Sequence, residues 1–287
     1  MTFIDWALGH ELVIRLGAFF GMFALMAIWE ALVPRRARLL SRRVRWPHNL
    51  ALVGLNSLLL RLLFPVAAVG FALIGAERGW GLLNVFDVPF WWAFMLSVVV
   101  LDFAIYMQHV MFHAIPLLWR LHRVHHADAD FDVTTGTRFH PIEMLLSMLI
   151  KFAAIAVLGA PAAAVLVFEV LLNATAMFNH ANLRLPERVD RLLRLILVTP
   201  EMHRIHHSME AVEANSNFGF SLAWWDRLLG TYRDRPRLPQ ESMAIGVQGL
   251  TGNNASVNLA GMLALPWKEA GSGYAIDSNP ESGHRAR

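Results

Sequence analysis

The sequence predicts an all-α integral membrane protein. We expect about three spanning helices, a membrane hairpin, and a cytoplasmic helical cap that carries a histidine-rich site for two metal ions. Hydrophobic residues make up 56% of the 287 residues, charged residues only 16%, and the mean hydropathy is +0.43, values typical of membrane proteins. Apolar runs alternate with short polar segments, and histidines cluster where the apolar runs end.

The composition also excludes several classes of protein. The chain has no cysteine, so disulfides, thiolate metal sites and iron–sulfur clusters are ruled out. The net charge of +3 and the pI near 9.8 are compatible with nucleic-acid binding. The basic residues, however, fall where a membrane protein places them, and we expect no nucleic-acid partner.

The first apolar segment is Leu12–Val33, whose 22 residues are enough to cross a bilayer. It has no basic leader and no cleavage pattern, so we interpret it as a retained anchor. Six arginines follow between Arg35 and Arg45. We interpret them as a solvated cytoplasmic loop, which places the N-terminus outside.

The second and third spans are predicted at Asn49–Ala76, which Arg61 and Pro65 interrupt, and at Val88–Met107. In the third span and just beyond it, helical spacing aligns Asp102 with Tyr106, His109 and His113. An acid within an apolar span is often functional. We therefore predict that Asp102 lines the route to the metals or supports His109; the alternative is an acid satisfied by a neighbouring helix.

Two shorter apolar runs, Ile142–Leu158 and Ala162–Phe178, are separated by Gly-Ala-Pro and predict a hairpin that dips into or through the membrane. Both hairpin ends then lie on one side, which brings His180 beside His140. The polar segment 127–140 is predicted to be a loop or short helices at the cytoplasmic surface, and 182–234 to form short cap helices. The expected regions are 1–89, membrane helices and basic loop; 90–234, catalytic; 235–267, C-terminal extension; and 268–287, disordered tail.

Three histidine motifs predict a metal site: H-x-x-x-H at His109 and His113, and H-x-x-H-H beginning at His122 and again at His203. Residues three and four apart share one face of a helix, and imidazole is a common ligand of iron, zinc and copper. The alternative, histidines on a solvated helix face, does not explain three recurrences. With His140 and His180 there are ten candidate ligands, too many for one metal ion: His109, His113, His122, His125, His126, His140, His180, His203, His206 and His207.

Some assignments have a simpler alternative. His140 precedes a proline and is equally typical of a helix start, and His180 follows a polar run. We do not expect His10, His48 or His284 to bind metal. Five acids near the motifs are candidates to accept a hydrogen bond from a metal-bound imidazole; the alternative is that they are solvated surface charges. They are Asp128, Asp130, Glu143, Glu201 and Asp226. Asn179 and Asn182 flank His180 as candidate donors, and Trp119, Trp224 and Trp225 are expected to be interfacial anchors.

The order of these motifs resembles the fatty acid hydroxylase/sterol desaturase superfamily over roughly residues 90–232. W-R-L-H-R-V-H-H, T-R-F-H-P-I-E, F-N-H-A-N, N-S-N-F-G and W-D-R-L-L-G-T resemble it as well. The resemblance implies a membrane enzyme with two iron ions at the cytosolic face, which uses O2 and external electrons to hydroxylate or desaturate a lipid or sterol-like substrate. Zinc can replace the iron in purified protein.

The motifs leave the reaction open between hydroxylation, desaturation and an alkylglycerol-type ether cleavage. A metal transporter is a remote alternative, because it requires ligands at mid-membrane depth rather than at the ends of the spans. No electron-transfer domain is evident, so we expect a separate donor similar to cytochrome b5 or a ferredoxin. The arginines of the loop and cap are expected to bind anionic headgroups or this donor. A multi-pass protein of a bacterial inner membrane is the location we expect.

Overall fold

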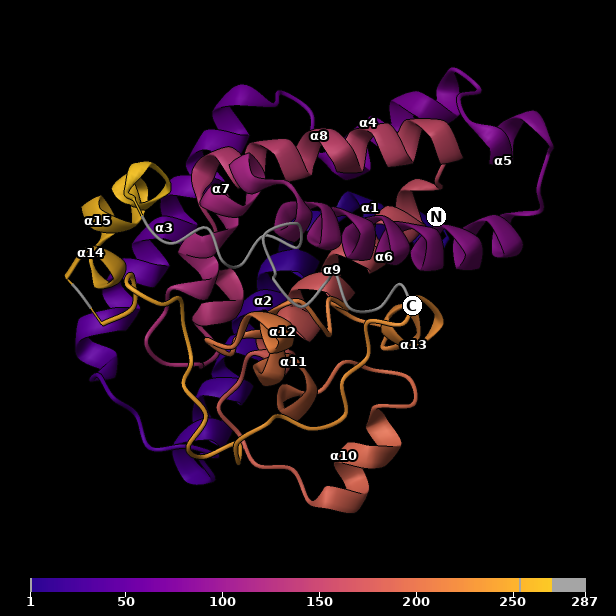
Figure 1. The fold of residues 1–287 in the computed structure, drawn as a ribbon. Helices are drawn as coiled ribbons and strands as arrows, with labels where there is room; N and C mark the ends of the chain where they lie inside the picture. Colours follow the sequence, from indigo (N-terminus) through magenta and orange to yellow (C-terminus); the bar gives the residue numbers. More distant parts are fainter. Residues whose placement is uncertain (1, 253, 270–287) are drawn as a thin grey trace.

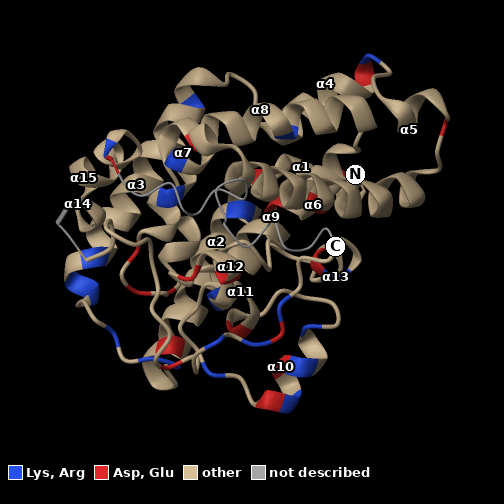
Figure 2. Ribbon diagram, viewed as in Figure 1, with Lys and Arg blue, Asp and Glu red and all other residues tan. Residues whose placement is uncertain are grey.

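The computed structural model describes residues 2–252 and 254–269, and in this part of the chain every regular element is a helix. Figure 1 shows two regions: long helices pack together in one, and short helices joined by loops form the other. Charged side chains gather mainly in the second region, around α10, while α4, α6 and α8 carry few (Figure 2). This division agrees with an apolar membrane region and a polar cap.

Five segments are long and apolar enough to cross a membrane, and they coincide with the predicted spans and hairpin. They are Glu11–Leu32, Arg42–Val85, Phe90–Ala114, Pro141–Leu158 and Ala162–Asn179. The first is α2, which follows the short α1 (Phe3–Gly9). The second comprises α3 (Arg42–Leu63), α4 (Ala68–Glu77) and α5 (Leu82–Val85), and the predicted interruption near Pro65 separates α3 from α4. The third is α6, Phe90–Ala114.

The predicted hairpin is present as α8 (Pro141–Leu158) and α9 (Ala162–Asn179). It turns at Gly159, whose φ of 75° lies in the left-handed region that favours glycine. The hairpin packs on α4 and α6 around a core that includes Val69, Leu101, Leu158 and Phe168. Helix α2 runs alongside α9, so the hairpin is enclosed by the N-terminal helices.

Shorter helices build the rest of the molecule: α7 (Pro116–His126), η1 (Thr135–Thr137), α10 (Glu187–Leu193), α11 (Pro200–His206), α12 (Ala211–Ala214) and α13 (Trp224–Leu228). The C-terminal extension forms α14 (Asn254–Val257), α15 (Leu259–Ala264) and η2 (Leu265–Trp267). Met262 and Leu265 pack against Leu52 of α3 and Trp119 of α7, so the extension joins the main body. Of the predicted tail 268–287, residues 270–287 lie outside the described residues.

Two expectations for polar segments are wrong. The segment Ala127–His140 is almost entirely buried rather than a surface loop. Arg45, expected in a solvated loop, belongs to α3 and is fully buried. Its guanidinium donates to both carboxylate oxygens of Asp128, at 2.6 and 2.8 Å, and to Asp132 at 2.6 Å. The segment is buried because Arg45 neutralises its acids, and charges of both signs satisfy one another there.

Candidate metal centre

The histidine motifs lie where helices end. His109 and His113 occupy the last turns of α6, His126 ends α7, and His206 ends α11. His180 is the residue that caps the C-terminus of α9. The four C-terminal ends therefore converge on one region, and the partial negative charge of each end favours a cation between them.

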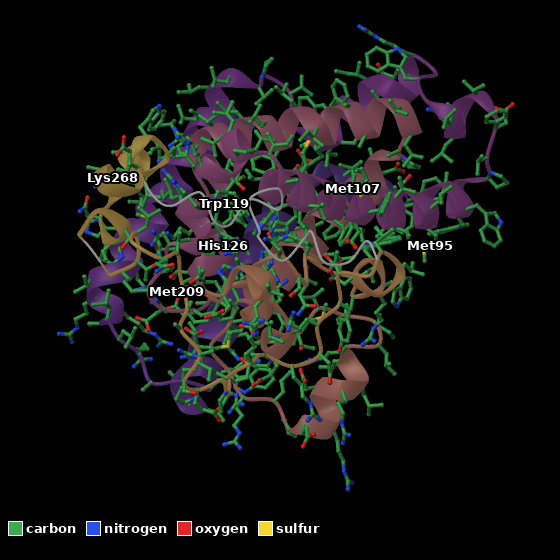
Figure 3. The ribbon with its side chains drawn as sticks, in the orientation of Figure 1. Met95, Met107, Trp119, His126, Met209 and Lys268 are labelled. Atoms are coloured by element: carbon green, nitrogen blue, oxygen red, sulfur yellow. The ribbon has the colours of Figure 1, made fainter. Side chains whose placement is uncertain are left out.

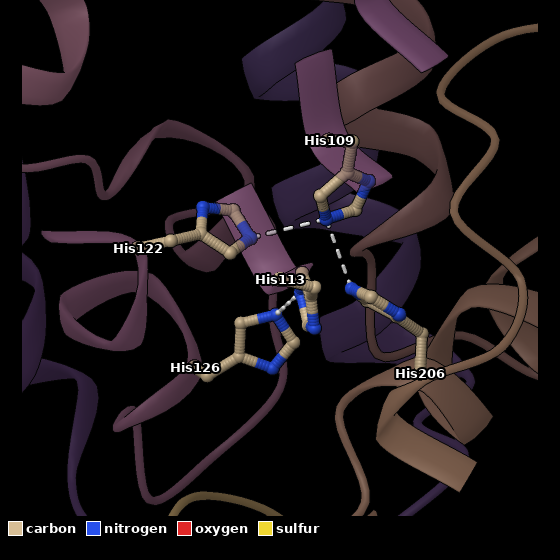
Figure 4. Close-up of side chains that lie close together, drawn as sticks. All are labelled: His109, His113, His122, His126 and His206. Carbon is tan, nitrogen blue, oxygen red and sulfur yellow. Dashed lines mark hydrogen bonds between the residues drawn. The ribbon is translucent and has the colours of Figure 1, made fainter. Parts of the chain in front are cut away.

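Five imidazoles form a first group, those of His109, His113, His122, His126 and His206 (Figure 4). The Nε2 atom of His109 lies 3.0 Å from Nε2 of His122 and 3.0 Å from Nε2 of His206. The Nε2 atoms of His113 and His126 are 3.2 Å apart. All five rings are buried.

A second group adjoins the first and comprises His125, His180, His203 and His207. Nε2 of His180 lies 3.1 Å from Nε2 of both His125 and His203, and 3.2 Å from Nε2 of His207. The rings of His126 and His207 stack with their centroids 4.4 Å apart, which places the two groups side by side. Figure 3 shows His126 in the interior of the molecule, close to Trp119.

The hydrogen bonds made by the Nδ1 atoms determine whether the Nε2 atoms, which face one another, carry a lone pair or a proton. Nδ1 of His109 donates to the carbonyl oxygen of Phe218 at 2.7 Å, and Nδ1 of His206 donates to that of Ser216 at 2.8 Å. A carbonyl only accepts, so in the neutral rings both Nε2 atoms are unprotonated. Two lone pairs that face each other at 3.0 Å repel unless a cation lies between them. In the second group, Nδ1 of His180 donates to the carbonyl oxygen of Ala176 at 2.8 Å, so its Nε2 atom is unprotonated as well.

A proton is a poor candidate for that cation. Burial lowers the pKa of His122 and of His180 to about 3. Burial, together with the neighbouring imidazoles, also lowers the pKa of His125 and His203 well below 6.5. The rings are therefore neutral near pH 7, which is the form that binds metal ions.

The distances fit metal ligation. Two imidazole nitrogens that bind one ion at about 2.1 Å, with an angle between 90 and 110°, lie about 3.0–3.4 Å apart. The observed separations of 3.0–3.2 Å fall in this range for both groups. Nine imidazoles in two adjoining groups thus suit two metal ions, and nitrogen ligands suit iron among others.

Glu143 holds one of these imidazoles in place. Its Oε1 atom accepts a hydrogen bond of 2.6 Å from Nδ1 of His122, and both side chains are buried. A carboxylate in this position fixes the ring's tautomer and makes Nε2 a stronger ligand. Among the five candidate acids, only Glu143 has a hydrogen bond to a histidine of the two groups within the described residues.

The other candidate acids are buried and organise the surrounding loops, so they are not solvated charges. Asp128 pairs with Arg45, Asp130 accepts from the backbone N–H groups of residues 39 and 40, and Glu201 pairs with Arg35. Asp226 accepts from the backbone N–H groups of Phe218 and Gly219, and so positions the carbonyl that His109 uses.

Aromatic side chains surround the imidazoles. Phe139 stacks on His125 with a centroid distance of 4.5 Å, and Phe220 contacts His109 at 5.1 Å. Trp119, expected as an interfacial anchor, is only 4% exposed, and its ring lies 4.8 Å from that of His113. It therefore belongs to the apolar wall of the centre, which excludes water from the imidazoles.

Asp102 does not contact the histidines. Its Oδ2 atom accepts from Nε1 of Trp225 at 2.8 Å and from the backbone N–H of Leu222 at 3.2 Å. The carboxylate thus fastens the start of α13 to α6. This arrangement matches the alternative of an acid satisfied by a neighbouring segment, and gives no support to a place on the route to the metals.

Asn179 and Asn182 also act at a distance from the imidazoles. Asn179 donates to the carbonyl oxygen of Phe220, whose ring contacts His109. Asn182 exchanges two hydrogen bonds of 3.0 Å with the backbone of Arg36. The first positions a wall residue of the centre, and the second attaches the arginine segment to the cap.

The structure does not bring His140 to either group. Its Nδ1 atom accepts from the backbone N–H of Ile142 and caps the start of α8, while Nε2 lies 3.3 Å from the carbonyl oxygen of Leu263. A histidine before a proline at a helix start is well placed for this role, because Nδ1 can reach an unpaired N–H of the first turn. The arrangement therefore gives no support to His140 as a ligand.

A cavity of about 420 Å³ reaches the first group of histidines. His109, His122, Phe112, Phe139 and Phe220 line it near the centre, and residues of α2, α3, α6, η1, α8 and α9 line the remainder. Its volume is typical of a site for a small molecule or a lipid chain. Its walls come from α2, α3, α6, α7, η1, α8 and α9, together with Phe139 and Phe220.

Comparisons with known proteins agree with this centre. Residues 94–231 match the fatty acid hydroxylase family model. The chain is 33% identical to an ornithine lipid hydroxylase of Rhizobium tropici over 187 residues, and this aligned region covers 65% of this chain and 54% of that protein. It is 29% identical over 161 residues to an alkylglycerol monooxygenase of Xenopus tropicalis, covering 53% of this chain and 34% of that protein.

A cholesterol 25-hydroxylase of Mus musculus is 27% identical over 154 residues, which covers 53% of this chain and 50% of that protein. The chain thus spans about half, or less, of the length of these relatives. No solved structure is significantly similar to it.

Proposed function

We propose, from the match of residues 94–231 to the fatty acid hydroxylase family model, that the chain is a membrane oxygenase that hydroxylates a C–H bond of a lipid. The reaction would use two iron ions, O2 and electrons from another protein. The observation that carries the proposal is the pair of adjoining imidazole groups, in the first of which the Nε2 lone pairs of His109 and His206 face each other.

Nine histidines would hold the two metal ions: His109, His113, His122, His126 and His206 in one group, and His125, His180, His203 and His207 in the other. Iron bound in these groups would activate O2 for attack on an unactivated C–H bond, which side chains alone cannot achieve. Glu143 keeps His122 in the tautomer that presents Nε2. The aromatic wall keeps water away from the reacting carbon.

The cavity supports a lipid substrate. It lies among helices that are candidate membrane spans, and it ends at His109 and His122. A substrate drawn from the bilayer would therefore reach the centre without passing through water. The ornithine lipid hydroxylase, alkylglycerol monooxygenase and cholesterol 25-hydroxylase among the relatives are consistent with a lipid or sterol-like substrate.

Desaturation and ether cleavage remain alternative outcomes on the same scaffold. The alkylglycerol monooxygenase relatives favour ether cleavage as the second candidate. A metal transporter fits less well, because the histidines lie at the ends of helices and in short connecting helices. We further propose a cytoplasmic active site in a bacterial inner membrane, served by a donor similar to cytochrome b5 or a ferredoxin.

Mass spectrometry of membrane lipids tests the proposal. Cells that produce the protein are grown under isotope-labelled O2, beside cells that produce the His125→Ala variant. A lipid that gains one labelled oxygen atom only with the intact protein identifies a hydroxylase and its substrate. A lipid that loses two hydrogens without label indicates a desaturase. If purified protein loaded with iron and supplied with reductant and these lipids neither incorporates label nor removes hydrogen, the proposed function is wrong.

A further inference from the structure

Three charged side chains line the part of the cavity that is distant from the histidines. They are Arg15 of α2, Lys151 of α8 and Glu169 of α9. Nζ of Lys151 lies 2.6 Å from Oε1 of Glu169, and Nη1 of Arg15 lies 2.9 Å from Oε2 of the same carboxylate. Glu169 is 3% exposed, so two cations share one buried carboxylate.

The distance from this ionic group to the histidines follows from helix geometry. Lys151 lies eight residues beyond Glu143 on α8, which is about 12 Å along the axis. Ser147 lies midway, and all three side chains line the cavity at a spacing of four residues. On α9, Glu169 is eleven residues before His180, or about 16 Å. The cavity therefore connects the ionic group to the candidate metal centre.

The ionic group carries an excess positive charge. Arg15 and Lys151 contribute two positive charges and Glu169 one negative charge. The cavity has one further acidic residue among its described lining, Glu143, which is engaged by His122. One cation would have been enough to neutralise Glu169. A second cation in an apolar surrounding is costly unless an anion compensates it, and both cations retain N–H groups beyond those that face Glu169.

The cavity is open on the side formed by α2 and α3. Leu16 and Phe20 of α2 line it and are 47% and 61% exposed. Ser57 of α3 lines it and is exposed as well. Arg15, whose side chain is 33% exposed, lies beside this opening. These exposed lining residues belong to α2 and α3, both within candidate membrane spans, so in a membrane this side of the cavity would face lipid.

We propose that Arg15 and Lys151 form a subsite for the single negative charge of a lipid substrate, a carboxylate or a phosphodiester. The anion neutralises the excess charge, and the apolar chain extends past Ser147 toward His109 and His122. The inference rests on the proposed function in taking this cavity as the substrate site. It adds that the substrate is anionic, and that the carbon that reacts lies several bonds from the charged group.

Binding of three probes that share one chain length tests the subsite. The probes are palmitate, palmitoyl lysophosphatidylglycerol and hexadecanol, which carry a carboxylate, a phosphodiester and no charge. The full-length protein in an uncharged detergent at pH 8 is titrated with each, and tryptophan fluorescence reports binding. We expect at least one anionic probe to bind at least about tenfold more tightly than hexadecanol. The anionic probe with the higher affinity identifies the type of anion.

Variants then locate the preference. The measured quantity is the ratio of the affinity for the anionic probe to the affinity for hexadecanol. Lys151→Met is expected to bring this ratio close to one, and Lys151→Arg to leave it unchanged. Glu169→Gln raises the excess charge and is expected to increase the ratio, whereas a purely structural ion pair would give no such increase. Arg78→Gln changes an exposed arginine outside the cavity and should leave the ratio unchanged. Equal binding of all probes by the unmodified protein, or a ratio that Lys151→Met and Glu169→Gln both leave unchanged, would overturn the subsite.

These measurements need no turnover, so the two proposals fail separately. Headgroup preference without oxidation of any lipid would contradict the proposed function and leave the subsite in place. Oxidation of a lipid without headgroup preference would contradict only the subsite.

Discussion

Replacing Arg45 by methionine should destabilise the whole cap, because the change leaves Asp132 without a counter-ion and Asp128 with only Arg138, at 3.5 Å. Arg45 donates three hydrogen bonds of 2.6–2.8 Å to Asp128 and Asp132, and all three side chains are at most 2% exposed. Removing one partner of a buried ion pair costs about 3–5 kcal/mol. For a chain of this size that corresponds to a fall in melting temperature of roughly 6–20 °C. Because Asp128 follows His125 and His126 closely, the metal content should fall as well.

Thermal unfolding in detergent, followed by tryptophan fluorescence, measures this effect. Arg43→Met is the matched control, because Arg43 lies two residues away and is exposed. Its melting temperature should stay within about 1–2 °C of the unmodified protein, as is usual for a surface substitution. Adding Asp132→Asn to Arg45→Met should recover part of the loss, since the carboxylate that lost its only counter-ion disappears. If Arg45→Met melts no lower than Arg43→Met, the buried ion network does not support the cap.

Three further outcomes follow from the centre and its support. Glu143→Gln replaces the carboxyl group that accepts from His122 and should weaken metal binding about 10–100-fold in competition with a chelator. Glu201→Gln, whose carboxyl group contacts no histidine, should not. Gly136→Ala places a Cβ atom 2.5 Å from the carbonyl oxygen of Ala176 and 3.2 Å from Nδ1 of His180, so it should displace His180 and lower the metal count per chain. An unchanged count would show that the backbone moves to accept the methyl group without displacing His180. The charges of Arg45 and Arg138 outweigh the effect of burial and lower the pKa of Asp128 to about 2. The ionised carboxylate therefore stabilises the fold above pH 4, and this contribution is lost as the pH falls toward 2. Asp128→Asn should abolish that part of the acid transition when melting is measured as a function of pH.

Local patterns in the sequence predicted most of the fold and the grouping of the histidines. Helical spacing placed His109 with His113 and His203 with His206, and the two apolar runs around Gly159 predicted the hairpin that returns His180 to the same region. These predictions depend on periodicity and chain direction, which are properties of short segments. The structure accordingly brings nine of the ten candidate ligands together.

The sequence is less informative where a side chain's partner is distant in the chain. Arg45 was interpreted as solvated because its partners lie 83 and 87 residues away. The carboxylate of Asp102 faces Trp225 rather than His109, which becomes evident only when α13 packs on α6. His140 was grouped with the ligands on residue type, although its position before Pro141 also suits a helix cap. Type and spacing identify a histidine cluster, but long-range packing decides which groups face it.

The metal content of the folded, purified protein tests the central claim most directly. The protein is produced with excess iron, its fold is verified by a cooperative melting transition, and metal ions per chain are counted by elemental mass spectrometry. We expect two metal ions per chain, iron or zinc, and a lower count for His180→Ala, whose Nε2 atom lies within 3.2 Å of three other imidazoles. A well-folded chain that binds one metal ion or none under these conditions would contradict the assignment of the two histidine groups as a two-metal centre.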